Sequence, residues 1–172
     1  PPVRVAVESR DTFALAGSLG FPIFIRHQMP IPQLQDLLEQ YRQARLLAGF
    51  DGPNDVILQI GGYVAETAEQ AYNDPMESSL RRIRVLQENL DKAADQESYE
   101  RLKASSSVTY DDLLQRVAFG TPQAVVERLE EYREQLGITG ISLDINPGGQ
   151  VPYEKVVTSL RLLTEEVMPH FK

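Results

Sequence analysis

Short apolar runs alternate with amphipathic helical segments along this chain, and no other feature of the sequence limits the fold as strongly. The predicted strands are residues 3–7, 21–25, 56–64 and 141–145, and a helical pattern follows each of them. Parallel strands need a helical crossover to become neighbours, so this alternation predicts right-handed β/α units around a parallel sheet. We therefore expect an α/β fold with four such units, which is half of a (β/α)8 barrel.

Capping residues mark where the predicted helices begin. Ser9 or Asp11 is placed to cap the first helix, and Thr67 has the capping-box spacing to Gln70. Thr121 precedes a proline at the first position of a helix that should run to Gly137. These signals place the helices between the strands, as β/α units require.

Residues 73–118 interrupt this regular pattern. They contain a charged helical stretch, a serine run and a short apolar pattern near their end. Long excursions from a compact domain are commonly active-site lids. We expect residues 1–172 to form a single domain in which residues 73–118 are a lid or mobile insertion.

Half of a barrel leaves two unpaired sheet edges, which favours the presence of a second half. The chain begins Pro-Pro-Val directly before a strand, and we expect the other half to lie N-terminal to it. A four-stranded doubly wound sheet is the alternative fold. No glycine-rich phosphate-binding motif follows any predicted strand to support that alternative.

Composition narrows the classes of partner. A formal net charge of −8 argues against a nucleic-acid partner, which would need clustered Lys and Arg. The chain has no Cys and only two His, His27 and His170, so we expect no metal site. No apolar run approaches the roughly 18 residues of a membrane span, and we expect a cytoplasmic protein without a membrane partner.

Five segments, in this order, resemble the luciferase-like family of flavin-dependent monooxygenases. They are residues 5–9 (VAVES), 19–23 (LGFPI), 119–122 (FGTP), 136–141 (LGITGI) and 166–171 (EVMPHF). The resemblance implies that the chain is the C-terminal half of a TIM (β/α)8 barrel, strands five to eight with their helices.

Enzymes of this family use reduced FMN and oxygen to oxidise small organic substrates, and a sister branch uses a deazaflavin instead. The resemblance thus implies an oxidoreductase with FMN as cofactor, a flavin reductase as a possible partner, and a homo-oligomer. The family's catalytic histidine belongs to the other half of the barrel, so we expect this chain alone to be inactive. The alternative is a non-catalytic barrel subunit or assembly protein.

The resemblance also places the flavin phosphate at the loop after the first strand, on Glu8, Ser9 and Thr12. Hydroxyls and free backbone N–H groups at a helix start suit a phosphate. Ser is also a common N-cap residue, and for Ser9 capping is compatible with phosphate binding. Arg10 is a candidate counter-charge for the phosphate, or a solvated helix residue. Glu8 would repel a phosphate, so we expect it to orient its neighbours or to offer its backbone.

The end of the second strand provides two further candidates. Arg26 and His27 would lie on the same barrel face as the loop and approach the flavin or substrate, although a lone His is more often an ordinary loop residue. Gln59, Tyr63 and Glu66 follow on the third strand and its exit, and the sequence does not choose among them. No catalytic residue is assigned.

Overall fold

The computed structural model describes residues 3–26, 29–94, 96, 99–100, 103 and 107–171. The chain forms two compact units. The first unit comprises residues 1–60 and 128–143, and the second comprises residues 61–127 and 144–172.

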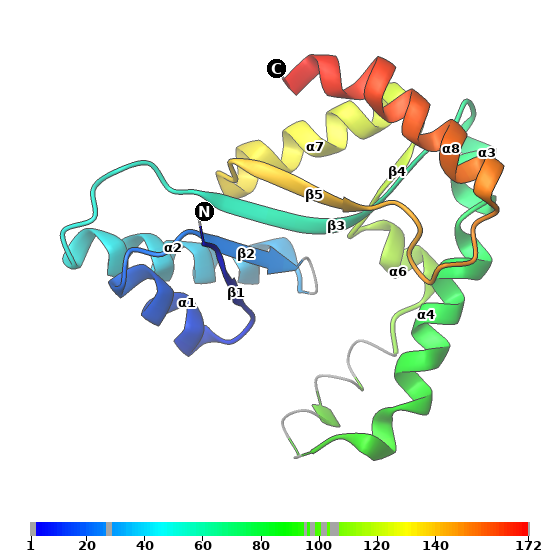
Figure 1. Ribbon diagram of the computed structural model, residues 1–172. Helices are drawn as coiled ribbons and strands as arrows, with labels where there is room; N and C mark the ends of the chain where they lie inside the picture. Colours follow the sequence, from blue (N-terminus) through cyan, green and yellow to red (C-terminus); the bar gives the residue numbers. More distant parts are fainter. Residues whose placement is uncertain are drawn as a thin grey trace. The chain divides into compact units, whose positions relative to one another are not determined.

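Parallel strands followed by helices make up the first unit (Figure 1). The elements from residue 5 to residue 47 are β1 (Val5–Val7), α1 (Arg10–Ser18), β2 (Ile23–Arg26) and α2 (Ile31–Leu47). Strand β1 pairs with β2, and β2 pairs in turn with the first part of β3 (Val56–Val64). Every one of these pairings is parallel, as the alternation of strands and helices predicts.

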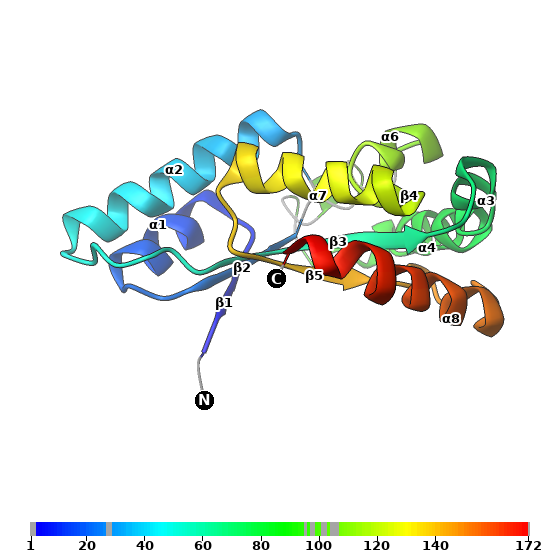
Figure 2. The same ribbon diagram turned by 90° about the horizontal axis from the view of Figure 1, so that it is seen from above.

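The strands of this unit have two different faces. Ile23 and Ile25 of β2, with Val56 and Leu58 of β3, are at most 1% exposed. Figure 2 shows α1 and α2 on one side of β1 and β2, and the buried faces of these helices supply Phe13, Leu34 and Leu38. The residues that alternate with these along each strand are more exposed, because successive side chains point to opposite faces of a sheet.

Helices α1 and α2 pack closely, and a glycine makes this possible. A Cβ added at Gly17 would overlap the backbone carbonyl oxygen of Tyr41. The Tyr41 hydroxyl donates to the carbonyl of Phe21 at 2.9 Å, and the buried Arg45 donates to the carbonyl of Gly20 at 2.9 Å. The chain that leaves α1 is therefore fixed to α2 just before β2 begins.

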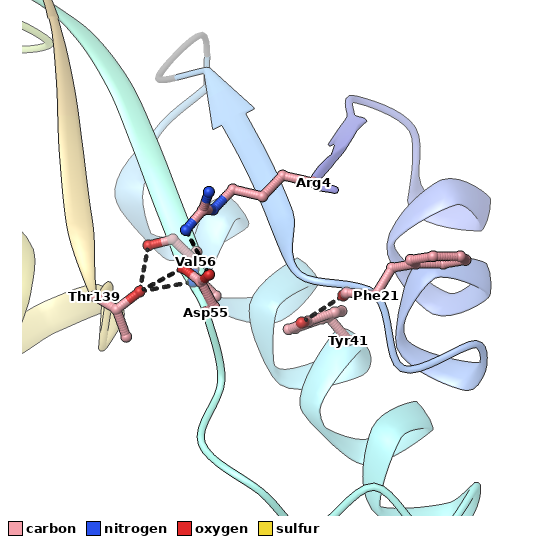
Figure 3. A network of polar contacts seen from close by, with 6 residues as sticks. All are labelled: Arg4, Phe21, Tyr41, Asp55, Val56 and Thr139. Carbon is pink, nitrogen blue, oxygen red and sulfur yellow. Dashed lines mark hydrogen bonds and ion pairs between the residues drawn. The ribbon is translucent and has the colours of Figure 1, made fainter. Parts of the chain in front are cut away.

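Polar contacts join the start of β3 to the start of β5 (Gly140–Asp144), which is β3's other neighbour (Figure 3). Arg4 pairs with Asp55 at 2.7 Å, and the Thr139 hydroxyl donates to the same carboxylate at 3.2 Å. The backbone N–H of Val56 donates to that hydroxyl at 2.9 Å. These contacts lie at the N-terminal ends of the strands.

The second unit contains the rest of β3 and its parallel neighbour β4 (Ala118–Gly120), with Gly62 opposite Ala118. In the ranges 68–94 and 107–114 its helices are α3 (Ala68–Asn73), α4 (Met76–Glu88), η1 (Leu90–Lys92) and α6 (Tyr110–Leu114). Helix α7 (Pro122–Leu136) begins in this unit, and α8 (Tyr153–Leu162) continues as a π-helical turn and a final 3-10 turn, η2 (Leu163–Val167) and η3 (Met168–Phe171).

The predicted α/β class with parallel strands and intervening helices is confirmed. Ser9, not Asp11, caps α1, and Thr67 with Gln70 forms a capping box at α3. The short strand β4 is not among the predicted strands, because its three residues carry no alternation and precede a helix start. None of the helices in the described ranges is long and apolar enough to cross a membrane.

Candidate functional site

The turn between β1 and α1 brings together the four residues predicted to bind a cofactor. Glu8 and Ser9 follow the C-terminal end of β1, while Arg10 and Thr12 lie in the first turn of α1. The backbone of Ser9 is extended, with φ −97° and ψ 154°, which is the usual conformation of an N-cap residue. The sequence thus places this turn where parallel α/β folds hold ligands, beyond the carboxyl end of a strand.

Ser9 and Thr12 hold each other in a reciprocal capping box. The Thr12 hydroxyl donates to the carbonyl of Ser9 at 2.7 Å and accepts from the Ser9 backbone N–H at 3.1 Å. The Thr12 N–H donates to the Ser9 hydroxyl oxygen at 3.4 Å, and the two hydroxyl oxygens are 3.1 Å apart. Thr12 therefore shapes the turn, and the Ser9 hydroxyl proton is the one that can turn to a ligand.

The start of α1 also offers backbone donors and one cation. The N–H groups of Arg10 and Asp11 begin the helix, where no intrahelical acceptor exists for them. Arg10 is exposed and forms no ion pair with any residue that the structure describes. Two carboxylates, Glu8 and Asp11, are also exposed at this turn and oppose an anion. The donors and the helix dipole favour a phosphate there, and the carboxylates limit its affinity.

A second polar pair lies at the end of β2. Arg26 is the last residue of this strand and lies opposite Gln59 of β3 in the parallel register. The Arg26 Nε–H donates to Oε1 of Gln59 at 3.0 Å. The structure thus brings together Arg26 and one of the three β3 candidates. His27, the other predicted residue here, lies outside the described residues.

Tyr63, a further β3 candidate, belongs to a buried cluster in the second unit. Its hydroxyl donates to Asp74 at 3.0 Å, and Asp74 also pairs with Lys155 at 2.5 Å. Burial, aided by the hydrogen bond to Asp74, raises the pKa of Tyr63 well above its ordinary value. This cluster ties the end of β3 to α8, while Glu66 beyond the strand is exposed. No local sequence pattern predicts the contacts among Tyr63, Asp74 and Lys155, because Lys155 lies far along the chain from the other two.

A buried serine anchors the loop that follows β5. The Ser78 hydroxyl of α4 donates to the carbonyl of Pro147 at 2.7 Å and accepts from the N–H of Gln150 at 2.8 Å. Arg81, one turn further along α4, donates to the carbonyl of Gly148 at 2.7 Å. In Figure 1 this loop (orange) passes beside α4 (green). The sequence gives no signal for Ser78, since nothing local distinguishes it from Ser79.

These features define a parallel α/β protein with polar groups at the carboxyl ends of its strands. Residues 1–140 match the model of the luciferase-like monooxygenase family, and the chain belongs to that family. No curated protein sequence matches the chain.

Solved structures of similar fold support the architecture. The monooxygenase RslO1 from Streptomyces bottropensis is 23% identical with a TM-score of 0.71, and the match covers 100% of this chain and 49% of RslO1. The oxygenating constituent of 3,6-diketocamphane monooxygenase from Pseudomonas putida, solved with FMN, is 18% identical with a TM-score of 0.75. That match covers 98% of this chain and 48% of the other.

A third similar structure uses a different cofactor. The coenzyme F420-dependent tetrahydromethanopterin reductase from Methanopyrus kandleri is 16% identical with a TM-score of 0.66, over 99% of this chain and 51% of the reductase. This chain therefore spans about half the length of each of these three proteins. Its fold is half of a TIM barrel, as the four β/α units predict.

Proposed function

We propose that this chain supplies the phosphate-binding side of the flavin site in a flavin-dependent monooxygenase that acts on a small organic substrate. The observation that carries the proposal is the Ser9–Thr12 capping box, directly beyond the end of β1 in a chain of this family. FMN is the proposed cofactor.

The groups at this turn fit a phosphate. The N–H groups of Arg10 and Asp11 point along the start of α1, and the positive end of the helix dipole adds to their attraction. The Ser9 hydroxyl and the Arg10 guanidinium are further donors within the same turn. Thr12 holds the turn in shape through its bond to the Ser9 carbonyl. The turn would thus bind and orient the cofactor by its phosphate.

Reduced flavin would supply the electrons for oxygen chemistry, and the protein would supply position and shielding. The family's catalytic histidine has no assigned counterpart in this chain, so we expect no turnover by residues 1–172 alone. We also predict that a flavin reductase is a partner, that the protein forms a homo-oligomer, and that it is located in the cytoplasm.

The predicted lid, residues 73–118, contains anchored elements near its start and near its end. Besides the Ser78 contacts of α4, the Tyr110 hydroxyl of α6 donates to the carbonyl of Tyr72 at 2.6 Å. We propose that this segment covers the bound flavin and keeps water away from it during the reaction. Limited proteolysis of the full-length protein should then slow within residues 73–118 when FMN is added. Equal cleavage with and without FMN argues against a lid.

Flavin titration of the full-length protein tests the phosphate site. We expect FMN to bind at least about tenfold more tightly than riboflavin, which lacks the phosphate, because hydrogen bonds to a charged group contribute roughly 1.5–3 kcal/mol. Ser9→Ala should reduce that preference. Ser18→Ala, which removes a hydroxyl from the other end of α1, is the matched control. Equal binding of FMN and riboflavin would contradict the proposal.

The deazaflavin cofactor is the alternative, favoured by the similarity to the F420-dependent reductase. Both cofactors carry a phosphate, so the turn by itself favours neither. Titration with F420 beside FMN decides between them: tighter binding of F420 would assign the chain to the deazaflavin branch.

A further inference from the structure

The pair formed by Arg26 and Gln59 lies on the face of the sheet that α1 and α2 do not cover. Their neighbours along the strands, Ile25 and Leu58, are at most 1% exposed on the helix-covered face. Side chains alternate between faces, so Arg26 and Gln59 share the opposite face. In a (β/α)8 barrel this face is the interior, and its carboxyl end holds the ligand. Arg26 is the last residue of β2, at that end.

Gln59 orients the guanidinium without neutralising it. The acceptor is a neutral amide oxygen, which takes the Nε–H of Arg26 at 3.0 Å. The four N–H groups on the two terminal nitrogens remain for another partner. Those two nitrogens form the fork that matches a carboxylate or sulfonate with two parallel hydrogen bonds.

Arg26 has no carboxylate partner within the part of the chain that the structure describes. Other arginines of this acidic chain do have one: Arg4 pairs with Asp55 and Arg84 pairs with Glu77. Glu8 follows β1, the neighbouring strand, without forming an ion pair with Arg26. Arg26 is exposed in the described structure, so its terminal N–H groups are accessible to a ligand.

We infer that Arg26, positioned by Gln59, binds an anionic group, a carboxylate or a sulfonate, of the organic substrate. This inference rests on the proposed function, because it places the substrate on the same strand ends as the flavin. It adds a substrate class to that function: the oxidised molecule carries an acidic group, and Arg26 selects it over a neutral analogue.

Binding to the full-length, FMN-loaded protein tests the inference by calorimetry. The probes are acetate, octanoate and octanesulfonate, each compared with a neutral counterpart, namely acetamide, octanamide and octanol. We expect at least one anion to bind about tenfold or more tightly than its counterpart, as a charge-assisted hydrogen bond predicts. The octanoate and octanesulfonate arms distinguish the two acid classes.

Two variants test whether Arg26 and Gln59 cause the preference for anionic over neutral probes. Arg26→Met keeps an unbranched side chain but removes the charge and the donors, and should remove the preference while leaving the affinity for the neutral probes within about twofold. Gln59→Glu should also remove it, because the new carboxylate would pair with Arg26. Arg161→Met, which breaks an exposed ion pair with Glu165 on the last helix, is the control and should keep the preference.

Three outcomes would overturn the inference. The first is the absence of any anion preference in the FMN-loaded protein, and the second is an unchanged preference in Arg26→Met. The third is a loss of the preference for FMN over riboflavin in Arg26→Met, which would assign Arg26 to the cofactor phosphate. A parent protein that binds neither FMN nor F420 would instead overturn the proposed function, and this inference with it.

Discussion

Thr139 and Val56 are joined by hydrogen bonds in both directions at the start of adjacent strands. The Val56 N–H donates to the Thr139 hydroxyl at 2.9 Å (Figure 3). The Thr139 N–H donates to the Val56 carbonyl at 2.9 Å. Val56 is fully buried, so its N–H depends on that hydroxyl. These contacts lie at the N-terminal ends of the strands, whereas the candidate ligand groups lie at the carboxyl ends. In barrels of this type the first end serves stability and the second serves function.

Replacing Thr139 should therefore destabilise the protein without affecting flavin binding. Thr139→Val leaves the Val56 N–H without its acceptor, and we expect a loss of about 1–3 kcal/mol in the free energy of unfolding. Thr139→Ser keeps the hydroxyl and should lose less. Urea denaturation of the full-length protein measures both variants. Equal losses in the two would mean that the methyl group stabilises this end of the sheet as much as the hydroxyl does.

Gly17→Ala should separate α1 from α2. Its new methyl group would overlap the carbonyl oxygen of Tyr41, which is backbone and cannot rotate away. We expect a loss of about 1–3 kcal/mol, typical of overpacking, and a lower thermal midpoint. Gly52→Ala is the matched control, since a Cβ there meets nothing within 4 Å. If both variants unfold at the same temperature, the close approach of these helices does not contribute to the stability of the protein.

Local signals predicted the Ser9 cap of α1 but not the second unit's anchors, while the cofactor role of Ser9 and Thr12 was implied by the family resemblance. A capping box is a contact between residues three apart, so Ser9 and Thr12 are readable in sequence. The bond from Ser78 to Pro147 spans 69 positions, and no periodicity specifies which helix serine will meet a distant loop. The register that brings Arg26 opposite Gln59 likewise follows from sheet pairing, not from either strand alone.

The anchor at Ser78 is testable through two neighbouring glycines. Gly148 and Gly149 both have positive φ, 87° and 74°, so alanine is strained at either position. Only at Gly148 would the added Cβ also overlap the backbone carbonyl of Ser78. We therefore expect Gly148→Ala to lower the free energy of unfolding by more than Gly149→Ala does. Similar losses would show that backbone strain alone accounts for the lower free energy of unfolding.

Buried tyrosines should make the protein sensitive to alkali. Burial raises the pKa of Tyr132 to about 12, and it raises the pKa of Tyr63 and of Tyr110 as well. Because the pKa is higher in the folded state, the stabilisation is complete below the unfolded value near 10 and is lost as the pH rises through 12.

We therefore expect a constant free energy of unfolding up to about pH 9 and a steep decline above pH 10. Tyr132→Phe removes one of these phenols and should make the decline shallower, as urea denaturation at pH 8 to 11.5 would measure. Tyr153→Phe, at a residue that is 77% exposed, is the control. A decline equally steep in Tyr132→Phe and in the parent would mean that the pKa of Tyr132 is the same in the folded and unfolded states.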